Sequence, residues 1–352
     1  MLKLVTTLIF LTLTAASICG QSGRVKPTET PVPGPVIRPT GIYVPTQTAK
    51  TTATPTPTPT PKDDGDVVTV ESTLVPIPVS VVDTNGRAVT NLTLNDFELK
   101  IDGKVVELSE ISRSESPIRL AMLFDNSSSV FIAREFEKDA AIKFFKRVIR
   151  PRKDLVALYS VATITRLAQP FTSDVSLLIN AIEMFPPPEG ATSLLGGIVS
   201  ASEYMREVSG RRVIVIVSDG DDTMADATLD QAVRALQIAN CQVYVVKTTD
   251  FENYKRTGSR RGNANLQALA AERRMLEITR QTGGAVHSPL NERELDNAFG
   301  QISAELSEQY ILSYYPEDGA GYRGQFREIT LTLKNRPGLT LRTRKGYYVP
   351  KK

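Results

Sequence analysis

The spacing of hydrophobic residues changes along the chain and divides it into segments of different kinds. Residues 118–124 form one unbroken apolar run, which is typical of a strand buried on both faces of a sheet. Residues 131–149 follow with apolar side chains at helical spacing, and strands and helices then alternate as far as residue 306. Such alternation predicts a mainly parallel sheet with helices on both faces. We therefore expect a doubly wound α/β domain at residues 117–307.

One polar connection interrupts the alternation of strands and helices. It spans residues 251–265, carries four basic residues, and is expected to be either a recognition surface or a solvated loop.

The individual elements of this domain follow from the same spacing. Besides the first strand and helix, the predicted strands are 155–161, 213–217, 242–246 and 285–287, and the predicted helices are 175–185, 194–205, 229–239, 266–282 and 292–306.

The segments on either side of the α/β domain have a β pattern. Residues 67–116 contain β-branched runs and a predicted hairpin, in which strands 97–101 and 105–111 flank a turn at Asp102-Gly103. Residues 308–352 return to the same pattern. Neither segment has enough strands to be stable alone. We expect them to pair with each other in one small β domain that contains the α/β domain as an insertion.

The N-terminus has the pattern of an export signal. Residues 1–20 carry one early positive charge, Lys3, then an apolar run that is too short for a comfortable membrane span, then small residues. This predicts a secretory signal peptide and a protein that is secreted or held in the cell envelope, in the periplasm or at the cell surface. An uncleaved membrane anchor and a lipid on Cys19 remain alternatives.

Residues 21–66 are rich in proline and threonine, with 10 of the 22 prolines of the chain. A segment of this composition cannot bury a core and favours the extended polyproline II conformation. At ~3.1 Å per residue it would span up to roughly 140 Å. The sequence predicts a stalk or disordered linker.

Composition excludes several classes of function. The formal net charge is +3, so no strong positive field marks a nucleic-acid-binding protein. His287 is the only histidine, which argues against catalytic triads and multi-histidine metal sites. Without the signal segment Cys241 is the only cysteine, so an intrachain disulfide framework is excluded.

Three polar loops stand where chemistry is expected. Ligands of doubly wound sheets bind at the carboxyl ends of the strands. Residues 125–129 read Asp-Asn-Ser-Ser-Ser after the first buried strand, residues 190–193 read Gly-Ala-Thr-Ser before a helix, and residues 218–222 read Ser-Asp-Gly-Asp-Asp after another strand. Their oxygen atoms suit a small, hard divalent cation such as Mg²⁺. The candidate ligands are Asp125, Ser127, Ser129, Thr192 and Asp219.

Each candidate has an expected role. The hydroxyls of Ser127 and Ser129 suit direct ligation, and Thr192 would complete the ring directly or through water. Asp125 and Asp219 would supply negative charge, partly through water and through hydrogen bonds that orient the hydroxyls. Because few carboxylates would bind the cation directly, the cation would stay electrophilic. One coordination position would then be left for an Asp or Glu carboxylate of a partner. The adjacent Asp221 and Asp222 are expected to be solvated loop charges rather than residues that tune the metal.

These motifs, in this order, resemble the metal-ion-dependent adhesion site of von Willebrand factor A domains, and all five candidate residues match it. The wider chain, with Leu-Val-Pro-Ile-Pro-Val at 74–79 and Arg-Lys-Gly-Tyr-Tyr at 344–348, resembles a secreted bacterial VWFA-related family of acidobacterial type. The resemblance implies a Rossmann-like fold, Mg²⁺ with Mn²⁺ or Ca²⁺ as alternatives, and protein binding or adhesion without catalysis.

Two other functions remain open on the sequence. In one, the protein is a cell-envelope scaffold whose metal only stabilises the loops. In the other, which the resemblance disfavours, it is a metal-assisted hydrolase, and this would require a general base beside the metal.

Overall fold

The computed structural model describes residues 74–113, 115–259, 266–316 and 321–351. The predicted signal peptide, 1–20, and the predicted stalk, 21–66, lie outside the described residues, so both stay predictions from the sequence.

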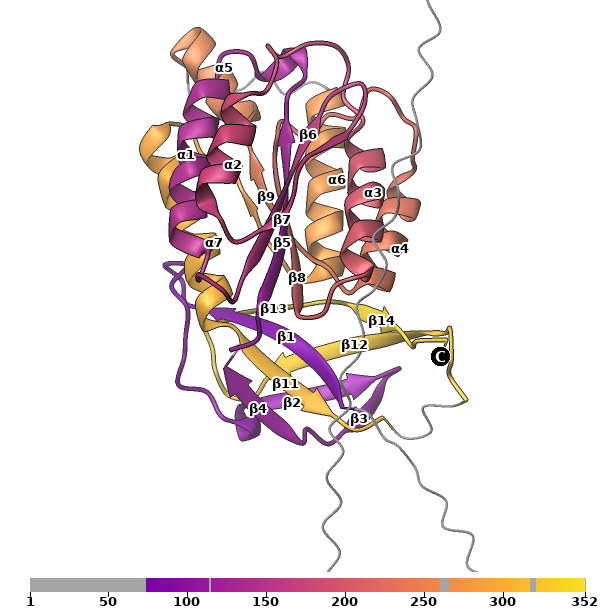
Figure 1. The fold of residues 1–352 in the computed structure, drawn as a ribbon. Coiled ribbons are helices and arrows are strands. Elements are labelled where there is room, and N and C mark those ends of the chain that lie inside the picture. The colour runs from indigo at the N-terminus through magenta and orange to yellow at the C-terminus, as the bar shows by residue number, and fades with distance from the viewer. Residues whose placement is uncertain (1–73, 114, 260–265, 317–320, 352) are drawn as a thin grey trace, which may run out of the picture. The chain divides into compact units, whose positions relative to one another are not determined.

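A mainly parallel sheet forms the centre of the α/β domain (Figure 1). In the described part of the chain it has six strands in the order β10-β9-β8-β5-β6-β7, and every neighbouring pair is parallel except β6 with the edge strand β7. This confirms the predicted fold class. The strands are β5 (Ile118–Asp125), β6 (Leu155–Val161), β7 (Arg166–Thr172), β8 (Arg211–Ser218), β9 (Gln242–Lys247) and β10 (Val286–His287).

Helices cover both faces of this sheet (Figure 1). On one face α1 (Arg134–Val148), α2 (Val175–Glu183) and α7 (Glu292–Glu308) share a core with the strands, and on the other α3 (Leu194–Arg206), α4 (Leu229–Ala239) and α6 (Leu266–Thr282) do so. Within the described ranges, no helix combines the length and hydrophobicity that crossing a membrane would require. Shorter elements are the 3-10 turns η1 (Leu94–Asp96) and η2 (Ser128–Val130) and the helix α5 (Thr249–Thr257).

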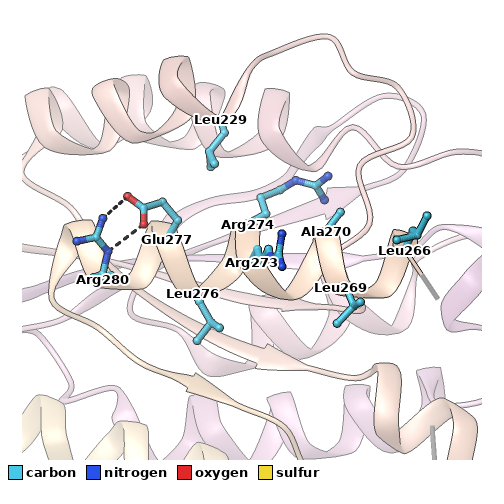
Figure 2. A pocket seen from close by; sticks show the side chains of 9 residues that line it. All are labelled: Leu229, Leu266, Leu269, Ala270, Arg273, Arg274, Leu276, Glu277 and Arg280. Carbon is cyan, nitrogen blue, oxygen red and sulfur yellow. Dashed lines mark hydrogen bonds and ion pairs between the residues drawn. The ribbon is translucent and has the colours of Figure 1, made fainter. Parts of the chain in front are cut away.

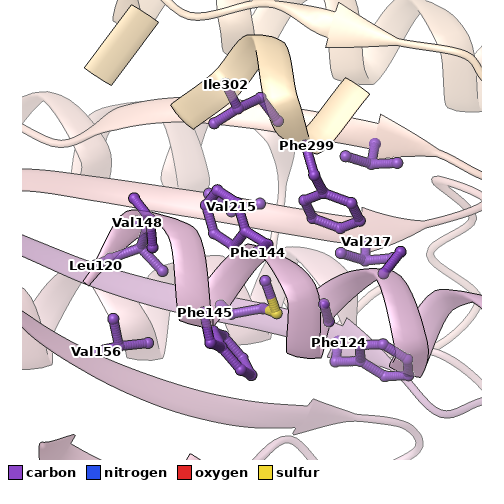
Figure 3. Close-up of a cluster of buried hydrophobic side chains, with 14 of the residues drawn as sticks. Leu120, Phe124, Phe144, Phe145, Val148, Val156, Val215, Val217, Phe299 and Ile302 are labelled. Carbon is purple, nitrogen blue, oxygen red and sulfur yellow. The ribbon is translucent and has the colours of Figure 1, made fainter. Parts of the chain in front are cut away.

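The first strand of the domain, β5, shows how the apolar run creates two cores. Successive side chains of a strand point to opposite faces. Leu120, Met122 and Phe124 therefore join the core beneath α1, α2 and α7 (Figure 3), whereas Ala121 and Leu123 join the core beneath α3, α4 and α6. All five are fully buried. Packing in both cores holds β5 in place and therefore also fixes the position of Asp125, its last residue.

Two local expectations were wrong or incomplete. The first part of the polar connection at 251–265 is helical, because it belongs to α5, and Gly258 directly after this helix has a left-handed conformation. Residues 260–265 lie outside the described residues. The edge strand β7 was not predicted, because its side chains are mostly exposed or half-buried and its pairing with β6 shifts in register.

The flanking β strands come from both sides of the α/β domain in the sequence and pair with each other, which confirms the predicted composition of the small β domain. In the described residues they form two sheets, with orders β13-β1-β11-β4 and β14-β12-β2-β3. The strands are β1 (Val75–Val82), β2 (Phe97–Ile101), β3 (Lys104–Val106), β4 (Glu110–Arg113), β11 (Tyr310–Tyr314), β12 (Phe326–Leu333), β13 (Thr340–Thr343) and β14 (Gly346–Tyr348).

The predicted hairpin was only half right. Asp102 and Gly103 both have positive φ, 49° and 79°, and they join β2 to the antiparallel β3 as expected. The predicted second strand, 105–111, is instead divided, because β4 leaves this sheet and pairs with β11 in the other. The chain thus changes sheets within the span that the apolar pattern presented as one strand.

Candidate metal site

The ends of β5 and β8 bring two of the predicted loops together. These strands are parallel neighbours with Phe124 opposite Val217, so the residues that follow each of them meet at one edge of the sheet. There the hydroxyl of Ser218 donates a hydrogen bond of 2.6 Å to Asp125 Oδ2. Both residues are fully buried. The carboxylate of Asp125 is therefore held in one orientation by the neighbouring strand.

The loop after β5 presents two hydroxyls to each other. Asp125 Oδ1 accepts a hydrogen bond of 2.9 Å from the Ser127 amide, which folds the loop back over the strand end. The hydroxyls of Ser127 and Ser129 then share a hydrogen bond, with their oxygens 3.0 Å apart. Adjacent oxygens around an octahedral Mg²⁺ with bonds of about 2.1 Å are separated by about 3.0 Å. This pair of hydroxyls therefore has the spacing of two neighbouring cation ligands.

The loop that carries Thr192 is tied to both other loops. Ser128 donates to the Gly190 carbonyl from its amide at 3.3 Å and from its hydroxyl at 3.0 Å. The Thr192 amide donates to Thr223 Oγ1 at 2.9 Å, and the Thr192 carbonyl accepts from the Thr223 amide at 2.9 Å. Thr192 is 2 % exposed. These contacts place its loop between the one that follows β5 and the one that follows β8.

Asp219 lies half-buried directly after β8. Its Oδ1 accepts from the Asp221 amide at 3.0 Å, and its backbone carbonyl accepts from Thr249 Oγ1 at 2.9 Å. Burial, and next the charge of Asp219, raise the pKa of Asp125 to about 7, against hydrogen bonds from Ser218 and Ser127 that lower it. Two carboxylates thus repel each other at an edge that also presents hydroxyl oxygens, which is an arrangement that a divalent cation would stabilise.

The donor chemistry of the site fits a hard cation. The part of the chain that the structure describes contains no group of three or more His, Cys, Asp or Glu side chains placed to hold a metal ion. The predicted set does not require one, because it combines two carboxylates with three hydroxyls. The structure links Asp125 to Ser127 and Ser127 to Ser129 by hydrogen bonds, and it joins the loops of Thr192 and Asp219 to this loop. The five residues remain a predicted ligand set.

Asp222 has a structural role that the sequence did not reveal. Its Oδ1 accepts from the amides of Leu194 and Leu195 at 2.8 and 3.0 Å, so it caps the N-terminus of α3, and the expectation of a solvated loop charge was wrong. The two partners precede it by 28 and 27 positions. No local capping pattern spans that separation. Asp221, by contrast, accepts from Gln267 Nε2 at an exposed position.

Helix α6 supports the loop that carries Asp219. Arg274 Nη1 donates to the Gly220 carbonyl over 2.6 Å, and Gly220 has a φ of 87°. A Cβ at Gly220 would lie 3.2 Å from Met275 Cγ and 3.4 Å from Ala271 Cβ. Glycine is therefore needed here both for the backbone conformation and for the close approach of the helix.

An open groove of about 690 Å³ runs over α6 and the first residue of α4 (Figure 2). Its lining is largely apolar and includes three arginines of α6, one of which, Arg280, pairs with Glu277. Arg274 borders the groove and also binds the loop after β8, so the groove is adjacent to the candidate site. The lining residues are Leu229, Leu266, Leu269, Ala270, Arg273, Arg274, Leu276, Glu277 and Arg280.

Comparison with known proteins gives one family match. Residues 120–283 match the model of the von Willebrand factor type A domain. No curated protein matches the chain. The narrower resemblance to an acidobacterial family is not tested by this match and stays a prediction.

Several solved structures are similar to parts of this chain at low sequence identity. A von Willebrand factor type A protein from Catenulispora acidiphila is 11% identical over 80% of this chain and 75% of its own, with a TM-score of 0.45. BatB from Bacteroides thetaiotaomicron is 16% identical over 53% of this chain and 97% of its own, with a TM-score of 0.40. The PilB minor pilin from Streptococcus sanguinis is 12% identical over 55% of this chain, with a TM-score of 0.42, and the aligned part spans 62% of the pilin.

Proposed function

We propose that residues 120–283, which match the von Willebrand factor type A domain, bind a protein partner by capturing an Asp or Glu carboxylate of the partner through a divalent cation. The observation that supports this most is the pair of hydroxyls on Ser127 and Ser129, 3.0 Å apart and directly after the buried Asp125. Oxygen donors at this spacing suit Mg²⁺, with Mn²⁺ or Ca²⁺ as alternatives.

The roles of the five residues follow from their chemistry. The hydroxyls of Ser127 and Ser129 would be direct ligands, and the Thr192 hydroxyl would bind directly or through a water molecule. Asp125 and Asp219 would supply negative charge and orient the hydroxyls. A cation held mainly by neutral oxygens keeps the Lewis acidity that attracts a carboxylate from the partner.

Binding without turnover is the activity that we propose. A hydrolase would need a general base beside the metal, whereas the two carboxylates of the candidate ligand set orient the loops. Both oxygens of Asp125 already accept hydrogen bonds, from the Ser127 amide and from the Ser218 hydroxyl. One oxygen of Asp219 accepts from the Asp221 amide. These carboxylates act in orienting the loops.

We further propose that the protein is exported and works in the cell envelope or outside the cell. This proposal rests on the sequence of residues 1–20 and on the proline-rich segment 21–66, which would hold the binding domain away from its point of origin. An uncleaved anchor or a lipid on Cys19 would retain it at the membrane.

The test is calorimetric titration of the protein with Mg²⁺ and Mn²⁺, followed by capture of proteins from an envelope extract with and without EDTA. We expect binding of the cation that Asp125→Ala abolishes, and an EDTA-sensitive partner whose acidic residue is required. A protein that binds no cation would contradict the proposal. A cation that raises the melting temperature without promoting capture would favour a scaffold in which the metal only stabilises the loops.

A further inference from the structure

Glu137 is a buried carboxylate without a hydrogen-bond partner. It lies in the first turn of α1, the helix that follows the loop of Ser127 and Ser129, and its exposed fraction is 0%. Neither of its carboxylate oxygens has a hydrogen-bond partner in the described part of the chain. Buried carboxylates are normally paired or hydrogen-bonded, because removing the charge from water is otherwise unfavourable. A structural role alone does not explain this side chain.

The surroundings of Glu137 belong to the candidate metal site. Thr248 directly follows β9, and its amide donates to the Ser218 carbonyl over 3.0 Å at the same sheet edge as Asp125. Burial raises the pKa of Glu137 well above its ordinary value, and the side chain of Thr248 acts in the opposite direction. The Thr248 hydroxyl oxygen also has no hydrogen-bond partner within hydrogen-bonding geometry among the described residues. The charged neighbours that act on Glu137 most are three further carboxylates, those of Asp125, Glu252 and Asp219.

The cationic side chains nearest in sequence are engaged elsewhere. Lys138 pairs with the exposed Glu135. Arg134 donates to the Asn126 side chain and to the carbonyls of Phe185 and Pro186. Glu252, the neighbouring carboxylate on α5, accepts from the Ala133 amide over 2.6 Å. Several carboxylates therefore lie near Glu137, and a cation bound at the candidate site would offset their charge.

We propose that Glu137 is a positioning residue for the divalent cation. It lies outside the ligand set, and its charge strengthens the attraction of the site for the cation while making the cation-free protein less stable. This inference rests on the proposed function. It accounts for the burial of this carboxylate near Asp125 and Asp219, because the free energy that burial costs in the cation-free protein is regained when the cation binds.

The test compares Glu137→Gln with Glu135→Gln. The first removes the charge and keeps the shape. The second removes a charge from the same end of the same helix, where the side chain is 71% exposed, so it controls for the helix dipole. Mg²⁺ affinity is measured by calorimetry, and the melting temperature is measured in EDTA and in saturating Mg²⁺.

We expect Glu137→Gln to weaken Mg²⁺ binding by about 10- to 100-fold, as loss of an outer-shell partner does, and to raise the melting temperature in EDTA. Glu135→Gln should change neither value. Glu137→Asp keeps the charge and should retain more affinity than Glu137→Gln, which protects the result against a general loss of packing. If wild-type protein binds Mg²⁺ and Glu137→Gln binds it equally well, the inference is wrong and the proposed function stands. If wild-type protein binds none, both fail.

Discussion

The hydroxyl of Ser218, the last residue of β8, donates a hydrogen bond of 2.6 Å to Oδ2 of Asp125, the last residue of β5. The two residues are 93 positions apart in the sequence and adjacent in the sheet. This bond holds the carboxylate at the candidate metal site, and the predicted ligand set did not include Ser218.

Replacing Ser218 by alanine should lower both stability and cation affinity. The variant loses a buried hydrogen bond to a carboxylate, worth about 1.5–3 kcal/mol. Asp125 also loses one of the two groups that orient it, so Mg²⁺ binding should weaken about tenfold. Denaturant unfolding and calorimetric titration measure the two effects. Unchanged Mg²⁺ affinity would show that the orientation of Asp125 does not matter for binding.

Gly220→Ala should destabilise the protein more than Gly258→Ala. Both glycines have positive φ, 87° and 69°, so each substitution carries a backbone cost of about 1–2 kcal/mol. Only at Gly220 would the new Cβ press against α6, at Met275 and Ala271, since no atom of the described residues lies within 4 Å at Gly258. Thermal unfolding of the two variants measures the difference. Equal losses of stability in the two variants would mean that α6 shifts to accommodate the added methyl group.

Asp222→Ala should loosen the N-terminus of α3. The variant removes the acceptor for the amides of Leu194 and Leu195, and loss of a helix cap costs about 0.5–2 kcal/mol. Asp221→Ala is the matched control, because that residue accepts an exposed hydrogen bond from Gln267. Hydrogen exchange at the first turn of α3 should accelerate in the first variant and not in the control. Equal exchange in both would contradict the capping role.

Asp154 should make stability depend on pH in the acidic range. Burial raises the pKa of this carboxyl. Hydrogen bonds from the Arg150 side chain and from the amides of Ile118 and Arg150 lower the pKa by more than burial raises it, so the net pKa lies below its ordinary value of 3.8. A lowered pKa in the folded state stabilises the protein above pH 3.8. This contribution is lost as the pH falls through the folded-state pKa.

The measurement is the free energy of unfolding at a series of pH values from 7 to below 3, for wild-type protein and Asp154→Asn. The variant should be less stable at pH 7, and its stability should fall less steeply than that of the wild type at acidic pH. Parallel pH profiles would assign the acid sensitivity to other carboxylates.

The periodicity of the sequence predicted the α/β domain well because the elements of that domain are long and buried. An apolar run such as 118–124 can only be satisfied between two layers of helices, and β5 lies there. The edge strand β7 escaped prediction because one side of it faces solvent and its side chains need not be apolar. The pairing of β4 with β11 in the other sheet could not be predicted either, because the spacing of apolar residues does not show which strand a segment pairs with.

The sequence by itself determined that polar loops would follow β5 and β8, because residue order and strand length place the oxygen donors at the strand ends. The tertiary structure decided how those donors are held. Ser218 orients Asp125, Asp222 caps a helix 28 residues before it, and Glu137 is buried with no hydrogen-bond partner among the residues that the structure describes. Each of these features depends on which strands and helices become neighbours. Burial then determines the free-energy cost of each charged side chain. The local spacing of apolar residues specifies neither the neighbours nor the burial of individual charges.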